Sequence, residues 1–248
     1  MRDGFAIFDA HTHLGEARHS GRTYSADEML AQMDACGIDR SLVIPFPIVD
    51  DYRKQHDEIA VPVRAQPARF AGAVCLNPFL PRKEFLDEVR RCVEELGFSG
   101  IKLQPQYQAL NPVSARSDFL FETASQYKIP VIWHTGSGAP FALPSLLIAP
   151  ARRFPDLPIV LSHCGGSVYF LEAIVAAGVC PNIYLELSSL MPHHILEVMA
   201  HVPASRLMIG SDLPESLDTE ISKIVGLPIG DEQKREVLWN TAARLFGK

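Results

Sequence analysis

The chain has 248 residues, a formal net charge of −6 and 47% hydrophobic residues, which is enough to bury a sizeable core. Acidic and basic residues are interspersed without a basic face, so we expect no nucleic-acid partner. No apolar stretch approaches the roughly 20 residues that a bilayer span needs, so we expect no membrane association.

The five cysteines are odd in number and form no C-x-x-C pair. This usage indicates free thiols in a reducing compartment and no disulfide framework. The first predicted strand begins at Phe5, which leaves no room for a signal peptide. We therefore predict a cytoplasmic protein.

Eight short apolar segments alternate with helix-like segments along the chain. The predicted strands are 5–13, 41–46, 70–76, 100–104, 130–134, 159–163, 183–187 and 207–210. The predicted helices are 25–37, a segment from 52 that is kinked at Pro62, 81–97, 116–127, 144–154, 165–174, 193–200, a short one after 217, and 231–246. Polar loops are expected at 16–24 and after residue 104 as far as 114.

This alternation, without a composition break, predicts an α/β fold, namely a single (β/α)₈ barrel domain over residues 1–248. A doubly wound open sheet is the alternative. Such a sheet normally carries a glycine-rich phosphate loop after its first strand, where this chain has His-x-His.

Polar residues follow several of the predicted strands, at the barrel end where chemistry collects. His11 and His13 end the first strand, and because their side chains are two positions apart they point to the same face. His134, His163 and Asp212 end the fifth, sixth and eighth strands. Any one of these histidines alone could be an ordinary core residue. Three neutral imidazoles and one carboxylate together suit a zinc-like divalent cation with an open position for water. The remaining histidines are interpreted as surface residues: His19, His56, His193, His194 and His201.

Six segments carry a resemblance to a known family. They are residues 9–13 (Asp-Ala-His-Thr-His), 97–103, 130–136, 161–166, 209–212 and 240–246. Their order resembles the amidohydrolase superfamily, and more narrowly the amidohydrolase-2 group, the relatives of aminocarboxymuconate semialdehyde decarboxylase. The resemblance extends over nearly the whole chain and implies a metal-dependent enzyme with a TIM-barrel fold.

The resemblance also implies roles for individual residues. A single metal ion, zinc above all, would be held by His11, His13, His134 and Asp212, and would lower the pKa of bound water toward neutrality. His163 would act as general acid/base, and Asp212 could also accept a proton. In the single-metal interpretation, which we favour, Lys102 is a charged group that contacts the substrate or supports the metal ligands. The alternatives are a carboxylated lysine that bridges two metals, and a structural lysine paired with a carboxylate such as Glu186.

The substrate is predicted to be a small carboxylate or cyclic compound. The predicted substrate-binding residues are Lys102, Arg53, Trp133 and Asn77, with further aromatic walls from Phe46, Phe79, Tyr107 and Phe141. Arg53 is assigned because it resembles in position a carboxylate-binding arginine of the decarboxylases.

Three functions remain open. The first is a hydrolase of a small amide, ester or lactone, using metal-activated water. The second is a metal-dependent non-oxidative decarboxylase of an aromatic or unsaturated carboxylate. The third is a non-catalytic metal-binding barrel, which would have no need of His163 as an additional base. Homo-oligomerisation is compatible with the sequence and is not determined by it.

Overall fold

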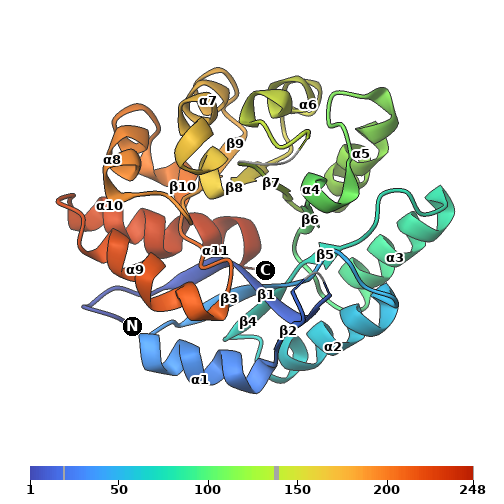
Figure 1. Cartoon of the computed structure of the whole chain (residues 1–248), viewed down its shortest axis with the longest axis horizontal. Helices are drawn as coiled ribbons and strands as arrows, with labels where there is room; N and C mark the ends of the chain where they lie inside the picture. The colour runs from blue at the N-terminus through green and yellow to red at the C-terminus, as the bar shows by residue number, and fades with distance from the viewer. Residues whose placement is uncertain (19, 137–139, 248) are drawn as a thin grey trace.

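The strands form a closed parallel barrel surrounded by helices (Figure 1). The computed structural model describes residues 1–18, 20–136 and 140–247. Its strands are β1 (Phe8–Ala17), β2 (Arg22–Tyr24), β3 (Arg40–Pro45), β4 (Phe70–Gly72), β5 (Val74–Cys75), β6 (Ile101–Leu103), β7 (Val131–His134), β8 (Ile159–Ser162), β9 (Ile183–Glu186) and β10 (Leu207–Met208). The predicted (β/α)₈ barrel is confirmed, and the open doubly wound sheet is not observed.

Two junctions close the barrel. β4 and β5 are one strand interrupted at Ala73. The Ala73 N–H donates to Val43 O at 3.1 Å, while the Val74 N–H donates to Gly100 O at 2.8 Å. At the other junction, the segment after β10 pairs with β1: Ala10 N–H donates to Ile209 O at 2.9 Å. Residues from the two ends of the chain therefore complete one ring.

Helices cover the outside of the barrel (Figure 1). They are α1 (Ala26–Cys36), α2 (Tyr52–Ala65), α3 (Arg82–Glu94), α4 (Pro105–Gln108), α5 (Asp118–Tyr127), α6 (Ile148–Arg153), α7 (Gly166–Val179), α8 (Pro192–His201), α9 (Leu217–Val225), α10 (Asp231–Arg235) and α11 (Thr241–Phe246). α1 begins with a capping box, in which Ser25 and Glu28 exchange hydrogen bonds. Among the described helices, none is both long and apolar enough to cross a bilayer.

Strand alternation divides the apolar side chains into two cores. The inner core fills the barrel with residues such as Ile132 and Val160. The helix α11 contributes Phe246 to this core. The outer core lies between strands and helices and includes Trp133 and Leu161. On each strand, every second side chain therefore points toward the barrel axis. The inward-pointing side chain nearest the C-terminal end of a strand lines the mouth of the barrel.

Several predicted segments differ from the structure. The loop expected at 16–24 begins with the end of β1 and contains β2, and the two pair as an antiparallel hairpin. The loop expected after residue 104 contains α4, and the helix expected at 231–246 is α10 and α11 joined by a π-helical turn at Glu236–Asn240. His56 was predicted at the surface but is fully buried, while His19 lies outside the described residues.

Candidate active site

The two histidines of β1 meet at the barrel mouth. The pairing of β1 with β3 is irregular between Asp9 and Thr12, and this bulge lies where the chain passes from Ala10, in the inner core, to His11. A bulge re-aims side chains, and here the Nε2 atoms of His11 and His13 lie 3.3 Å apart. The same-face prediction for the pair is confirmed.

The other ring nitrogens of this pair fix the tautomers. His11 Nδ1 lies 3.1 Å from Glu186 Oε2, and His13 Nδ1 lies 3.2 Å from the carbonyl oxygen of Ile44. Both partners are acceptors, so each Nδ1 carries the proton and donates it. The two Nε2 atoms are then unprotonated, and their lone pairs are directed at a common point.

Asp212 completes this convergence. Its Oδ1 lies 3.5 Å from His11 Nε2 and 3.7 Å from His13 Nε2. In the described chain, the ligand atoms of His11, His13 and Asp212 all lie within 4.8 Å of one another. Two imidazole lone pairs and a carboxylate oxygen facing one point are a donor set that fits a divalent cation.

His134 lies at the rim of this cluster. Its ring packs edge-on against His163, with 4.7 Å between centroids, and it lines a cavity of about 230 Å³ together with His163 and Asp212. It is not among the three residues whose ligand atoms lie within 4.8 Å of one another. The structure thus brings three of the four predicted ligands into one group and places the fourth beside it.

Glu186, at the end of β9, connects the metal ligands to His163. Its Oε2 accepts from His11 Nδ1 and from the backbone N–H of His163 at 3.0 Å, and it also accepts from the Ser188 hydroxyl at 2.9 Å. Ser188 Oγ in turn lies 2.7 Å from His163 Nδ1. Because the hydroxyl donates to Glu186, it accepts from His163, so His163 Nε2 is unprotonated and lies 3.8 Å from Asp212 Oδ1.

The sequence prediction did not assign Glu186 to the site, although a signal was present. It is an acidic residue that ends an apolar strand, as Asp212 is after β10. The prediction mentioned it only as a candidate partner for Lys102.

Lys102 is fully buried in the mouth. Its Nζ donates to Ser162 Oγ at 2.9 Å and lies 3.0 Å from His11 Nε2. Burial lowers the pKa of Lys102 to about 8, against the opposing effect of the Asp212 charge. The amine therefore lies directly beside the group formed by His11, His13 and Asp212.

Burial also keeps the histidines neutral. Desolvation, reinforced by the charge of Lys102, lowers the pKa of His11 well below its usual value of 6.5, and that of His13 to about 4. Desolvation and the neighbouring His11 lower the pKa of His163 as well. Neutral imidazoles are the form that binds metal ions and accepts protons.

The segment that carries Asp212 is anchored to β1 by Asp9, which the sequence analysis also left unassigned. The Asp9 carboxylate accepts from the backbone N–H of Ser211 and from its hydroxyl, both at 2.8 Å. Burial raises the pKa of Asp9 to about 7, although these bonds oppose the shift. Gly210 permits the close packing, since a Cβ there would lie 2.7 Å from the Cβ of His11 and 2.8 Å from Glu186 Oε1.

Strained backbone accompanies these side chains. His163, Ser189 and Asp212 have φ values of 64°, 63° and 64°, a region that costs non-glycine residues free energy. All three follow the ends of neighbouring strands and line the 230 Å³ cavity. The surrounding hydrogen bonds hold this conformation and with it the direction of the three side chains.

Two of the predicted substrate-binding residues lie elsewhere. Arg53 is on the outside of α2, where its Nε pairs with Glu88 of α3 at 3.2 Å. Trp133 belongs to the outer core, stacked on Phe121 of α5, because alternation along β7 directs its neighbours Ile132 and His134 inward. Strand alternation, which predicted that His11 and His13 share a face, places Trp133 on the face opposite to His134. Asn77 does lie at the mouth, after β5.

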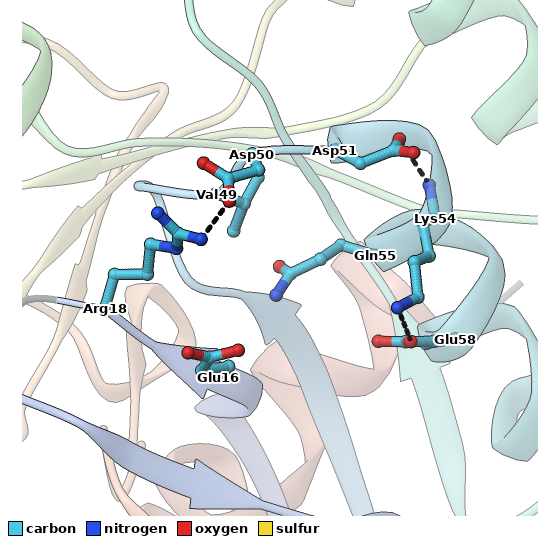
Figure 2. A pocket seen from close by; sticks show the side chains of 8 residues that line it. All are labelled: Glu16, Arg18, Val49, Asp50, Asp51, Lys54, Gln55 and Glu58. Carbon is cyan, nitrogen blue, oxygen red and sulfur yellow. Dashed lines mark hydrogen bonds and ion pairs between the residues drawn. The ribbon is translucent and has the colours of Figure 1, made fainter.

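A polar groove lies beside the mouth between the β1–β2 hairpin and α2 (Figure 2). Arg18 pairs with Asp50 and Lys54 with Glu58, and the Gln55 side chain points into the space between them. Four carboxylates line the groove against two cations: Glu16, Asp50, Asp51 and Glu58 against Arg18 and Lys54. This surplus of negative charge makes it a poor place for a carboxylate.

With this geometry established, comparison with known proteins identifies the family. The family model described as Amidohydrolase (Amidohydro_2) matches residues 8–248. The chain belongs to the amidohydrolase family. No curated protein matches the sequence.

Solved structures of similar fold include enzymes of three kinds. One is 5-carboxyvanillate decarboxylase from Novosphingobium aromaticivorans, complexed with manganese and 4-hydroxy-3-methoxy-5-nitrobenzoic acid (15% identity, TM-score 0.80, 100% of this chain and 97% of that one). The second is 4-oxalomesaconate hydratase from Rhodopseudomonas palustris (17%, 0.73, 97% and 95%). The third is a protein described as probable 2-pyrone-4,6-dicarboxylic acid hydrolase from Acinetobacter baumannii, with citric acid bound (13%, 0.71, 98% and 100%). At these identities, the likeness establishes the fold of this amidohydrolase-family protein and leaves its reaction open.

Proposed function

We propose that this amidohydrolase-family protein is a metal-dependent hydrolase of a small amide, ester or lactone. The observation that carries the proposal is the group of three unprotonated Nε2 atoms, from His11, His13 and His163, around the carboxylate of Asp212. Family membership supports metal dependence, and the enzymes of similar fold include a hydrolase.

The metal site that we propose consists of His11, His13 and Asp212, with His134 approaching from the rim as the fourth ligand. A divalent cation bound there would act as a Lewis acid and lower the pKa of a water molecule. Nitrogen and carboxylate donors with an open position suit zinc, and the manganese in the carboxyvanillate decarboxylase makes manganese the main alternative. We propose a single metal with Lys102 as a free amine, because His11, His13 and Asp212 form one group of ligand atoms that does not require a lysine to complete it.

The chain's own residues would then handle the protons. His163 Nε2 is free to accept a proton from the attacking water and to return it to the leaving group. Glu186, through Ser188, holds the His163 ring in this tautomer and stabilises the imidazolium that forms. Lys102 would direct a substrate carboxylate toward the cluster.

Non-oxidative decarboxylation is the second candidate, supported by the likeness to 5-carboxyvanillate decarboxylase. Here His163 Nε2 would first take up a proton from a water molecule and would then deliver it to the ring carbon from which CO₂ departs. The third hypothesis is a non-catalytic metal-binding barrel. It does not explain why His163 lies next to the group formed by His11, His13 and Asp212. Assays for CO₂ release and for acid release on one panel of lactones, amides and aromatic carboxylates distinguish the two reactions.

The first prediction concerns metal content. We expect one divalent metal per chain in the purified protein and its loss in His11→Ala, because that change removes one of the two imidazoles that converge on the site. Elemental analysis measures both. The matched control is His201→Ala, since His201 is exposed on α8 and its ring pairs with Glu197 on the same helix. Equal metal in the two variants would overturn the proposed site.

A further inference from the structure

The segment after β9 places two serines at the candidate active site. Ser188 is buried, and its Oγ lies 2.7 Å from His163 Nδ1. Ser189 instead lines the 230 Å³ cavity together with His163 and Asp212. The conformation of this segment therefore decides both how the His163 ring is held and what shape one wall of the cavity has.

The backbone of this segment is strained. Ser189 has a φ of 63°, a conformation that serine adopts at a cost and glycine adopts freely. Such a conformation persists where neighbouring groups hold it. Glu186 supplies one such group, since its Oε1 accepts from the backbone N–H of Ser188 at 2.6 Å. This bond lies on the N-terminal side of Ser189 and leaves the following peptide groups to other partners.

Helix α9 supplies those partners. Glu220 Oε1 accepts from the backbone N–H of Ser189 at 3.2 Å, and Lys223 Nζ donates to the carbonyl oxygen of Leu190 at 2.7 Å. The two side chains are three residues apart, so they lie on one face of α9, and they form an ion pair of 2.6 Å. Each charge therefore directs the other while both bind the backbone of residues 189–190.

The Glu220–Lys223 pair is shielded from solvent, since 9% of the Glu220 side chain and 14% of the Lys223 side chain are exposed. The helix that carries it is anchored in the outer core through Leu217, Ile221 and Ile224. Taking two charges out of water is costly, and apolar side chains of similar volume often stabilise a fold as well or better. What this pair adds is one acceptor and one donor, placed at the peptide groups of a strained segment.

We infer that Glu220 and Lys223 are positioning residues of the active site. They hold residues 188–190 so that Ser188 orients the His163 ring and Ser189 completes the cavity wall. The inference rests on the proposed function, in which His163 transfers protons. Neither Glu220 nor Lys223 is among the described residues that line the cavity, so both act through the segment that they bind.

Nitrogen NMR of the full-length, zinc-loaded protein with isotope-labelled histidine tests the inference without relying on turnover. Protonated and unprotonated ring nitrogens give well-separated signals, and His163→Asn assigns those of His163. In the wild type we expect a single tautomer with the proton on Nδ1. Lys223→Met removes the donor to Leu190 with little change in volume, so we expect a mixture of tautomers.

Turnover of the same variant is the second measurement. We expect kcat to fall roughly 10- to 100-fold in Lys223→Met, with a smaller change in KM, because the proton-transferring ring is misplaced. The matched control is Lys234→Met. Lys234 also donates to a backbone carbonyl, that of Val225 at the end of α9, and does not contact the segment after β9. An unchanged tautomer in Lys223→Met, or the same mixture in Lys234→Met, would overturn the inference.

Rescue by glycine separates positioning from general stability. Because glycine adopts a φ of 63° freely, Ser189→Gly should restore a single His163 tautomer and at least several-fold of the lost turnover to Lys223→Met. If Lys223→Met does not fold, Glu220→Gln takes its place, since it removes the charge that faces Lys223 and keeps an oxygen for the Ser189 N–H. Its smaller mixture of tautomers should also be reversed by Ser189→Gly. An absence of rescue in the folded variant would contradict the inference.

The two readouts keep this inference distinct from the proposed function. If the zinc-loaded wild type turns over none of the panel, the proposed function fails, and the His163 tautomer in the variants still decides whether Glu220 and Lys223 position the ring. If turnover depends on His163 and Lys223→Met retains the wild-type tautomer and rate, the inference alone fails.

Discussion

His163 differs from the other histidines of the mouth in what holds it. His11 and His13 donate to Glu186 and to a backbone carbonyl, so their free nitrogens are fixed toward Asp212. His163 is held by the rotatable hydroxyl of Ser188, which both donates to Glu186 and accepts from the ring. A proton that arrives at His163 Nε2 creates an imidazolium that Glu186 stabilises through this hydroxyl. This arrangement suits proton transfer better than rigid coordination.

We therefore expect His163→Asn to keep the metal and to reduce turnover by roughly 10²- to 10⁴-fold, the usual contribution of a general acid/base. Asparagine is the appropriate replacement because it tolerates the φ of 64° at this position. Turnover on the substrate panel and metal content are measured together. His193→Asn, on the exposed side of α8, is the control. Loss of metal would make His163 a ligand, and full turnover with metal retained would remove it from the mechanism.

At the scale of elements, α2 and α3 are joined to each other and to β5 by a buried polar network. His56 Nδ1 donates to Glu88 Oε1 at 2.8 Å, and His56 Nε2 accepts from the backbone N–H of Cys75. Arg91 adds two hydrogen bonds to Glu88, at 2.7 and 3.0 Å. Because Cys75 belongs to β5, the network ties both helices to the strand that borders Lys102.

The network predicts a specific pH dependence of stability. Burial opposes the Glu88 charge, but the bonds from His56 and Arg91 outweigh it and lower the pKa of Glu88 from 4.5 to about 2. A lowered native pKa stabilises the fold above pH 4.5, and this contribution is lost as the pH falls from 4.5 toward 2. It amounts to about 3 kcal/mol at neutral pH, on the scale of 1.36 kcal/mol per pKa unit.

Comparison with Glu88→Gln checks this. The difference in free energy of unfolding between wild type and variant should be full above pH 4.5 and shrink toward pH 2, as followed by urea denaturation. Glu94→Gln, which removes an exposed carboxylate from the same helix, should show no such trend. A difference that is constant with pH would contradict the lowered pKa.

At the scale of the whole molecule, the sequence predicted the features that repeat and the polar residues that interrupt them. Eight apolar strands with polar ends were enough to predict the barrel and to bring His11, His13, His163 and Asp212 to one mouth. The sequence could not predict features that depend on contacts between segments far apart in the chain. Glu186 belongs to the site because β9 places it 3.1 Å from His11 Nδ1. The ring of His56 can be buried because both of its nitrogens find partners on other elements, namely Glu88 and the backbone of Cys75. Arg53 was assigned by position alone, and its ion pair with Glu88 shows that the guanidinium faces α3.

Closure of the barrel also bears on the prediction that residues 1–248 form a single domain. β1 completes the ring only by pairing with the segment after β10, and α11 fills the base of the inner core. If the ends of the chain and its middle depend on one another in this way, no part should unfold separately, and all probes should report one transition.

The two tryptophans make this measurable, because they sit in different parts of the fold. Trp133 packs on Phe121 in the outer core, and Trp239 lies 5.7 Å from the Phe8 ring beside the inner core. We expect Trp133→Phe and Trp239→Phe, each retaining one tryptophan, to unfold in urea with a fluorescence midpoint equal to the midpoint of that variant's own circular dichroism. The two midpoints are compared within one variant, so a change in stability caused by the substitution shifts both and does not affect the comparison. A fluorescence transition of Trp239 that precedes the loss of helical signal would show that β1 and the C-terminal helices separate first, and the barrel would then be two units and not one.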